Sequence, residues 1–286
     1  MIPPQFGYVR ARTVDEAVAA LSEHDDAKLL AGGQSLLPIL RLRLAYPEVL
    51  VDLGRTAGTW GIRDEGDHLV IGAMTTHYEV LNSELVRRHC GLLAEATSTV
   101  ADPQVRHRGT FGGALSHADP AGDLPAVALA FGTTMVVAGP EGRREVPASE
   151  FFVDYLQTAL EPTDVLVEVR VPKLDADQGW GYRYEKFQRV AQAWAIVAVA
   201  ALVRHSDGTI SEARIGLTNM GATPLRATAA EAALTGARVG PAAVADAAAL
   251  AAEGTSPASD LSGQSDYRQH LARVLTQSAV AAAAET

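Results

Sequence analysis

The sequence predicts an α+β protein with a small α/β unit at its N-terminus and an antiparallel sheet covered by helices toward its C-terminus. Helix-like and strand-like segments alternate over residues 13–53, and three strand-like segments follow one another over residues 182–217. After Pro224 the chain is rich in alanine and has helical periodicity. Alternating segments are typical of α/β units, whereas strands followed by a run of helices indicate a separate sheet-and-helix layer.

Bulk composition fits a globular protein. The chain has 286 residues, 48% hydrophobic and 20% charged, which suits one large domain or two modest ones. A formal net charge of −10 opposes non-specific binding to nucleic acid. The apolar run 193–203 is too short to span a bilayer, and Pro3 and Pro4 stand where a signal peptide needs its apolar core. We therefore expect a cytoplasmic protein without a membrane span.

The single cysteine, Cys90, limits the redox chemistry of this chain. One thiol cannot form an internal disulfide, and alone it cannot ligate an iron–sulfur cluster or a structural zinc ion. We expect Cys90 to be a small packing residue, and we expect no metal site.

The N-terminal elements follow from local signals. Thr13 and Glu16 form a capping-box pattern that predicts a helix to about Ser22. A strand over 27–30, a glycine turn, a helix over 35–46 and a strand over 48–53 complete the unit.

The middle of the chain mixes strands, short helices and glycine-rich loops. Thr75 and Thr76 can cap a short helix, and Pro172 opens a plausible linker. The remaining predictions are strands at 68–73, 133–139 and 164–172, helices at 83–100 and 149–156, and a glycine-rich loop within 101–122 that leads into a helix.

The last third predicts an antiparallel sheet. Its strands are expected at 182–189, 193–204 and 209–217, with a tight turn at Asp207-Gly208. Helices at 228–235, 241–253 and 267–284 are expected to lie on this sheet, because alanine favours helix but buries little area.

Two glycine loops carry the chemical signal, at Ala31–Ser35 and at Thr110–Ala114. Glycine allows positive φ and close approach of a ligand to the backbone, and successive N–H groups form an anion-binding concavity. Neither loop matches the G-x-G-x-x-G or P-loop pattern. Together they predict a pyrophosphate held between two loops, which requires no basic side chain.

Polar residues after the second loop have two interpretations. Asp123 can accept hydrogen bonds from ribose hydroxyls, or it can cap the helix that begins at Leu124-Pro125; spacing alone favours the cap. Asp119 is expected to be a turn residue, and His117 either contacts a ligand or is simply hydrogen-bonded.

The two loops, together with a third motif, resemble a known family. The segments LLAGGQSLLP, ADPQVRHRGTFGGALSHADPAGDLPAV and YEKFQRVAQAWAIVAVAA are similar to the FAD-binding medium subunit of molybdenum hydroxylases, the group of carbon monoxide dehydrogenase and xanthine dehydrogenase. The similarity extends from Pro3 to the helix near residue 275. It implies a vanillyl-alcohol-oxidase-type FAD-binding domain of two α/β subdomains, residues 1–55 and 56–176. It also implies a C-terminal domain, residues 177–286, of antiparallel sheet covered by helices.

The resemblance also implies which residues bind FAD. The backbone of the first loop would hold the pyrophosphate and the second loop would close on it, while Asp123 would turn to the ribose side. Leu166, Lys186 and Trp194 would approach the flavin ring. The implied cofactor-binding residues are Ala31, Gly32, Gly33, Gln34, Ser35, Leu36, Thr110, Gly112, Gly113, Ala114, His117, Asp123, Leu166, Lys186 and Trp194.

For two of these residues the sequence allows a simpler interpretation. Lys186 could be a surface lysine paired with Glu185 or Asp177, and Trp194 could be a packing residue before a core strand. Under the resemblance, Lys186 would stabilise the reduced flavin and Trp194 would shield it.

The implied function is electron transfer, with no catalytic acid or base on this chain. FAD would pass electrons from iron–sulfur clusters on a small partner subunit to an external acceptor, and a large partner subunit would carry the molybdenum cofactor. The three subunits would assemble as a dimer of heterotrimers. Two alternatives remain open: a self-contained FAD-dependent reductase of the same superfamily, for which Tyr267 and His270 are the best proton donors, and a scaffold without FAD.

Overall fold

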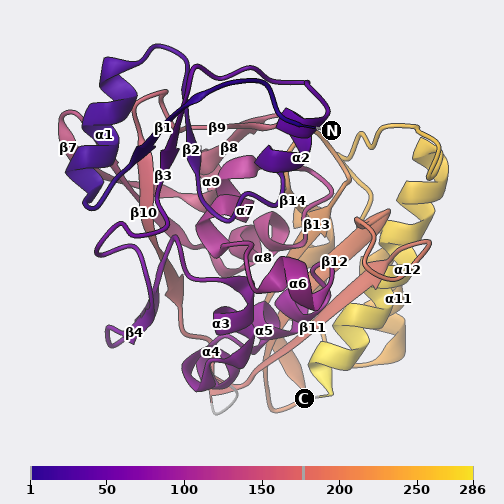
Figure 1. Ribbon diagram of the computed structural model, residues 1–286. Coiled ribbons are helices and arrows are strands. Elements are labelled where there is room, and N and C mark those ends of the chain that lie inside the picture. The colour runs from indigo at the N-terminus through magenta and orange to yellow at the C-terminus, as the bar shows by residue number, and fades with distance from the viewer. Residues whose placement is uncertain (1, 176–177, 286) are drawn as a thin grey trace.

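The computed structural model describes residues 2–175 and 178–285, which form three large sheets and one two-stranded sheet, with helices packed between and around them (Figure 1). Within these residues, no helix combines the length and apolarity that crossing a bilayer requires. The boundary predicted between residues 176 and 177 lies outside the described residues.

The N-terminal unit is a three-stranded parallel sheet with the order β1-β3-β2. Its elements are β1 (Gly7–Arg10), α1 (Val14–Glu23), β2 (Ala27–Leu30), α2 (Leu36–Arg41) and β3 (Val49–Asp52). The Thr13 hydroxyl accepts a hydrogen bond from the Glu16 N–H, as the capping pattern predicts. No local pattern predicted β1, and α2 is shorter than predicted because Arg43 adopts a left-handed conformation with φ 56°.

The second unit is a five-stranded antiparallel sheet with the order β4-β5-β10-β6-β7. Its strands are β4 (Ile62–Asp64), β5 (His68–Gly72), β6 (Thr134–Gly139), β7 (Gly142–Pro147) and β10 (Val165–Pro172). Its helices are α3 (His77–Asn82), α4 (Glu84–His89), α5 (Gly91–Ser98), α6 (Pro103–Arg106), α7 (Phe111–His117), α8 (Asp123–Phe131) and α9 (Ala148–Phe151). A small hairpin, β8 (Phe152–Asp154) with β9 (Gln157–Thr158), follows α9.

Three predictions for this unit were wrong. The helix predicted over 83–100 is two helices, α4 and α5, which meet at Cys90. A Cβ at Gly91 would overlap the ring of Tyr182, so the start of α5 lies directly against β11. The second glycine pair lies inside α7 rather than in a loop, and the helix predicted over 149–156 is found only at 148–151. Cys90 itself is fully buried, as predicted.

The C-terminal unit is a four-stranded sheet with the order β11-β12-β13-β14. Its elements are β11 (Trp180–Phe187), β12 (Val197–Ser206), β13 (Thr209–Thr218), β14 (Leu225–Arg226), α10 (Thr228–Leu234), α11 (Pro241–Ala249) and α12 (Ser265–Ala284). Asp207 and Gly208 form the predicted turn, both with positive φ. Strand β12 begins at Val197, four residues later than predicted, and residues 193–196 precede it as a loop.

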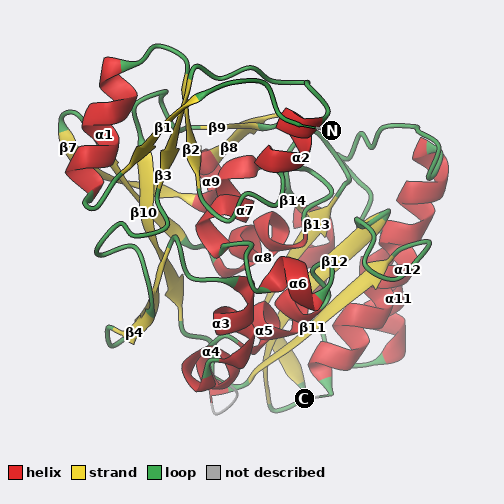
Figure 2. Cartoon of the chain, viewed as in Figure 1, coloured by secondary structure: helices red, strands yellow, loops and turns green. Residues whose placement is uncertain are grey.

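The C-terminal sheet is covered on both faces. Helix α12 covers one face (Figure 2) together with α10, and α11 packs against both of these helices; α8 packs against β12 and β13 on the other face. Gly216 of β13 makes this second contact possible, because a Cβ there would overlap the carbonyl of Ala126. One hydrophobic core therefore continues from the second unit into the C-terminal sheet, and it includes Phe111, Phe131 and Leu202.

Candidate functional site

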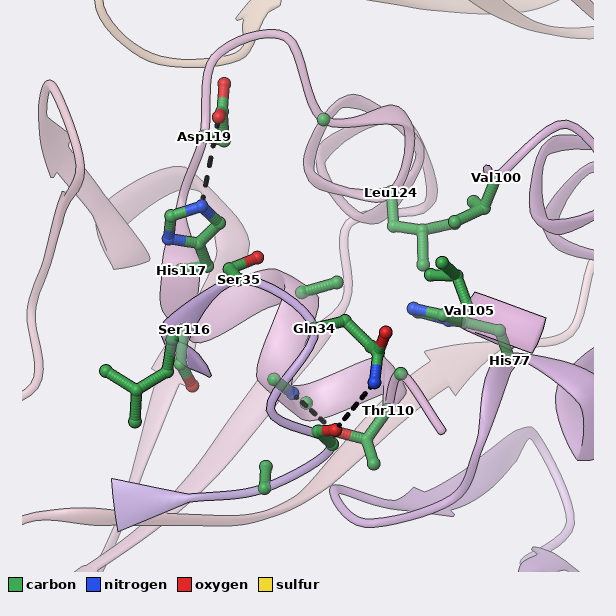
Figure 3. Close-up of a pocket in the computed structure, with 18 of the residues that line it drawn as sticks. Gln34, Ser35, His77, Val100, Val105, Thr110, Ser116, His117, Asp119 and Leu124 are labelled. Carbon is green, nitrogen blue, oxygen red and sulfur yellow. Dashed lines mark hydrogen bonds and ion pairs between the residues drawn. The ribbon is translucent and has the colours of Figure 1, made fainter. Parts of the chain in front are cut away.

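All three units contribute to one cavity of about 570 Å³, a volume within the range of small-molecule sites. Its walls come from the loop after β2, from α7 with the segment before it, from the start of α8 and from β11. Every cofactor-binding residue implied by the sequence, from Ala31 to Trp194, lines this cavity. Figure 3 shows part of the lining, with polar side chains toward one end and Val100, Val105 and Leu124 toward the other.

The first loop exposes a row of backbone donors. Gly33 has φ 74°, a conformation that favours glycine, and it turns the chain from β2 into α2. Among the described residues, none accepts a hydrogen bond from the backbone N–H groups of residues 32–36. The side-chain amide of Gln34 donates to the Gly32 carbonyl at 3.1 Å. This loop is thus preorganised with unpaired N–H groups, the arrangement that binds anions.

The second glycine pair has a different role. Its backbone N–H groups are already paired: Phe111 N donates to Thr75 O, Gly112 N to Ala73 O, and Gly113 N to the Thr110 hydroxyl oxygen at 3.1 Å. A Cβ at Gly112 would lie 2.5 Å from the Cβ of Ala73, so this glycine allows close packing onto the residue that follows β5. The segment therefore provides a wall and the Thr110 hydroxyl rather than a second row of free donors.

The two loops touch each other. A Cβ at Gly32 would overlap the carbonyl of Arg108, and a Cβ at Gly113 would stand 3.5 Å from the Cβ of Ala31. The two loops are therefore adjacent in the fold, and both line the same cavity.

A buried ion pair closes the far wall of the cavity. Lys186 Nζ lies 2.9 Å from Asp123 Oδ2, and the two side chains are only 4% and 6% exposed. The Tyr184 hydroxyl donates to Asp123 Oδ1 at 2.7 Å, and Lys186 Nζ also donates to the Thr99 carbonyl at 3.1 Å. The third ammonium proton has no acceptor among the described residues, and Lys186 lines the cavity.

This arrangement contradicts two of the simpler sequence interpretations. Asp123 is not a helix cap: Gly122 holds the N-cap position and Asp123 is the first residue of α8. Lys186 is not a surface lysine paired with Glu185, and the other partner considered, Asp177, lies outside the described residues. Burial raises the pKa of the Asp123 carboxyl, against the opposing effects of Lys186 and Tyr184, and it raises the pKa of Tyr184 as well.

His117 and Asp119 lie at the polar end of the cavity. His117 Nε2 is 3.8 Å from Asp119 Oδ2, and in Figure 3 His117 lies beside Ser35 of the first loop, with Asp119 beyond it. Asp119 also accepts from the N–H of Ala121 at 2.9 Å, so it is the turn residue that the sequence predicted.

Trp194 and Leu166 enter the cavity from different units. Trp194 is 56% exposed, so it is not the packing residue that its position before a core strand suggested. Leu166 is a buried residue of β10, at the edge of a β-bulge. Both line the same cavity.

Sequence reasoning missed several lining residues. The most informative is His77, whose ring is 4% exposed and whose Nδ1 is buried without a hydrogen-bond partner. No local pattern marks His77, because only its place in the fold brings it to the cavity. Further residues that were not predicted are Lys28, Leu29, Ile39, Leu53, Ala73, Met74, Val100, Ala101, Val105, Gly109, Ser116, Asp119, Gly122, Leu124, Pro125, Gln192 and Ala193.

Among the described residues, no group of three or more His, Cys, Asp or Glu side chains is placed to hold a metal ion.

Two sequence families match consecutive parts of the chain and together cover most of it. Residues 4–174 match the family described as the FAD binding domain in molybdopterin dehydrogenase, and residues 182–283 match the CO dehydrogenase flavoprotein C-terminal domain.

Similar proteins extend over the same length. The carbon monoxide dehydrogenase medium chain of Hydrogenophaga pseudoflava is 45% identical, over 99% of this chain and 98% of its own. The nicotine 6-hydroxylase medium subunit of Paenarthrobacter nicotinovorans is 34% identical, over 95% of each chain. Among solved structures, carbon monoxide dehydrogenase from Hydrogenophaga pseudoflava has a TM-score of 0.96 at 48% identity, covering 99% of this chain and 98% of that one. Quinoline 2-oxidoreductase from Pseudomonas putida 86 has a TM-score of 0.95 at 34% identity, covering 100% and 99%.

The buried ion pair generates a stability prediction. Lys186→Met leaves the Asp123 carboxylate buried without its countercharge, which should lower the free energy of unfolding by about 3–5 kcal/mol. The double variant Asp123→Asn/Lys186→Met removes both charges and should recover a large part of that loss. Urea unfolding of the three FAD-free proteins at neutral pH measures both effects. A double variant as unstable as the single one would contradict this account of the pair.

The His77 ring generates a pH prediction. Burial, and then the positive charge of Arg106, lower the pKa of His77 from 6.5 to about 4. Between these two values the unfolded chain binds more protons than the folded one, so the contribution of His77 to stability is complete above pH 6.5 and decreases as the pH falls toward 4. Over the whole range, the contribution of His77 to the free energy of unfolding changes by about 3 kcal/mol.

The variant His77→Asn does not titrate in this range and should lack that part of the pH dependence. Urea unfolding of FAD-free wild type and variant at several pH values between 4 and 7 gives the difference. Parallel stability curves for the two proteins would show that His77 titrates normally in the folded state.

Proposed function

Because the chain belongs to the family of FAD-binding medium subunits of molybdenum hydroxylases, we propose that it is the electron-transfer flavoprotein of a heterotrimeric oxidoreductase. It takes electrons from iron–sulfur clusters on a small partner subunit and passes them to an external acceptor. The substrate is oxidised on a large partner subunit that carries the molybdenum cofactor. The observation that carries this proposal is the cavity in which both glycine loops and Lys186 meet.

The residues around the cavity fit FAD. The unpaired N–H groups of residues 32–36 suit a pyrophosphate, and the Thr110 hydroxyl can donate to one of its oxygens. The apolar end, with Val100, Val105 and Leu124, suits the flat isoalloxazine ring. Residues Ala31–Leu36, Thr110, Gly112–Ala114, His117, Asp123, Leu166, Lys186 and Trp194 are proposed to bind the cofactor. Residues 1–176 would form the FAD-binding domain and residues 177–286 the C-terminal domain.

Bound FAD would supply the redox chemistry, exchanging single electrons with clusters and electron pairs with an acceptor. The chain supplies position and charge. The third proton of the Lys186 ammonium group can donate a hydrogen bond into the cavity, where it would stabilise negative charge on the ligand. Asp123 and the Thr99 carbonyl fix the position of that ammonium group. Trp194, exposed at the cavity, can cover the ligand from the C-terminal unit.

The two proton donors that the self-contained reductase alternative would use, Tyr267 and His270, lie away from the cavity. Tyr267 is 42% exposed and packs edge-on against Phe187, and His270 lies on the exposed side of α12. Neither residue lines the cavity. We accordingly propose a subunit in a complex, assembled as a dimer of heterotrimers in the cytoplasm.

The subunit assignment predicts the composition of the purified protein. When the chain is co-expressed with its genomic neighbours, it should co-purify with a large and a small chain, and molybdenum and iron should appear only in that complex. The isolated chain should contain flavin without either metal. Mass spectrometry of the co-purifying chains and metal analysis test this. A chain that purifies alone and reduces a soluble substrate with NAD(P)H would support the self-contained reductase.

The glycine loops predict which substitutions release FAD. Gly33→Val strains a backbone at φ 74°, and Gly113→Val places a side chain against the Thr110 hydroxyl, where a Cβ would lie only 2.6 Å away. Each should weaken FAD binding at least about tenfold, equivalent to about 1.4 kcal/mol. The bound flavin per chain, measured by visible absorbance after gel filtration, reports the loss.

Gly240→Val is the matched control, since its backbone is extended and open space surrounds it. Full flavin occupancy in both loop variants would refute the proposed pyrophosphate site, provided that circular dichroism shows the wild-type fold.

A further inference from the structure

The imidazole of His77 is a polar group that the protein itself leaves unsatisfied. The residue is 4% exposed, Nδ1 is buried without a partner, and no described residue forms a hydrogen bond with either ring nitrogen. Buried polar atoms in folded proteins are nearly always hydrogen-bonded, so an exception requires a physical explanation.

The backbone holds this ring firmly in place. His77 N donates to the Gly109 carbonyl at 2.9 Å, and the neighbouring Thr76 pairs with Thr110 in an isolated β-bridge. Thr76 and Glu79 form a complete capping box at the start of α3. A Cβ at Gly109 would lie 2.8 Å from His77 Cδ2, so the ring occupies space that only a glycine leaves free. The ring therefore cannot easily turn away to find a partner.

The surroundings of the ring define what it can bind. His77 lines the cavity and points into it beside Val105, with Val100 and Leu124 close by (Figure 3). This is also the end at which Lys186 is anchored, since its ammonium group binds the carbonyl of Thr99, next to Val100. Arg106, a cation whose charge acts on this ring, directs its guanidinium to the carbonyls of Val100 and Ala101.

The ring is therefore an uncharged donor or acceptor among apolar side chains. Such a group pairs with a neutral polar edge, such as a ring carbonyl, a ring nitrogen or a hydroxyl, better than with a phosphate, which the free N–H groups of residues 32–36 suit instead.

We propose that His77 is a cofactor-positioning residue that forms a hydrogen bond with the isoalloxazine–ribityl half of FAD. This inference rests on the proposed function and adds a residue that neither glycine loop nor the Lys186 motif indicates. It explains why a buried imidazole without a protein partner stands in an apolar wall: its partner is the ligand.

The proposal predicts opposite effects of one substitution on the two forms of the protein. His77→Leu fills the same space without an unsatisfied polar atom, so it should raise the Tm of the FAD-free full-length chain. The same substitution should weaken FAD binding about 10- to 100-fold, because it leaves a polar atom of the ligand unpaired. Thermal unfolding of the FAD-free protein and FAD titration followed by flavin fluorescence measure these two quantities.

Two further variants test the chemistry. His77→Asn can place an amide near the position of Nδ1 and should recover most of the affinity that leucine loses. His107→Leu is the control: His107 is an exposed histidine that stacks on Tyr78 and does not line this cavity, so FAD affinity should stay at the wild-type value.

The outcomes separate this inference from the proposed function. If wild type does not bind FAD, both fall. If wild type binds FAD and His77→Leu binds it equally well, only the inference is overturned. A leucine variant that is less stable than wild type without FAD, or that fails to fold, would show that the imidazole packs as a structural residue and would also overturn it.

Discussion

The site depends on a contact between two stretches of backbone. Gly32 lies so close to the carbonyl of Arg108 that no other residue could occupy its position unless one of the two backbone segments moved. This contact joins the parallel N-terminal sheet to the segment that leads into α7. Because Ala31 and Gly113 come together as a consequence, the free N–H groups of the first loop and the Thr110 hydroxyl of the second face one cavity.

A second close approach fixes the opposite wall. Helix α8 lies directly on β13 because Gly216 has no side chain, and this places Asp123, at the first position of the helix, within reach of β11. Lys186 and Tyr184 project from that strand on alternate positions and meet the two carboxylate oxygens. The ion pair itself adds little net stability once the desolvation of both charges is counted. The main effect of the ion pair is to fix the position of the Lys186 ammonium group at the cavity wall.

The parts of this structure that the sequence predicts are those set by local chemistry. The Thr13 cap, the Asp207-Gly208 turn, the three long C-terminal strands and the cavity-lining loops all follow from neighbours within a few residues. The parts that it does not predict depend on distant partners. The break at Cys90 reflects Tyr182 packing on Gly91, and the pairing of Lys186 joins residues 63 apart in the chain. His77 gives no signal at all, because its significance lies in the absence of a partner.

The unequal roles of the two glycine loops indicate how ligand binding is coupled to folding in this protein. The sequence suggests two equivalent pyrophosphate-binding loops. The N–H groups of residues 111–113, however, donate to the carbonyls of Thr75 and Ala73 and to the Thr110 hydroxyl, whereas those of residues 32–36 have no acceptor among the described residues. A protein that keeps a buried imidazole unsatisfied is less stable than it could be, and a ligand that pairs with this ring and with the N–H groups of the first loop binds the folded chain alone. Ligand binding and folding are thus coupled through the same atoms. The rigid second loop and the Gly32 contact hold those atoms in place before the ligand arrives, so little ordering remains to oppose binding.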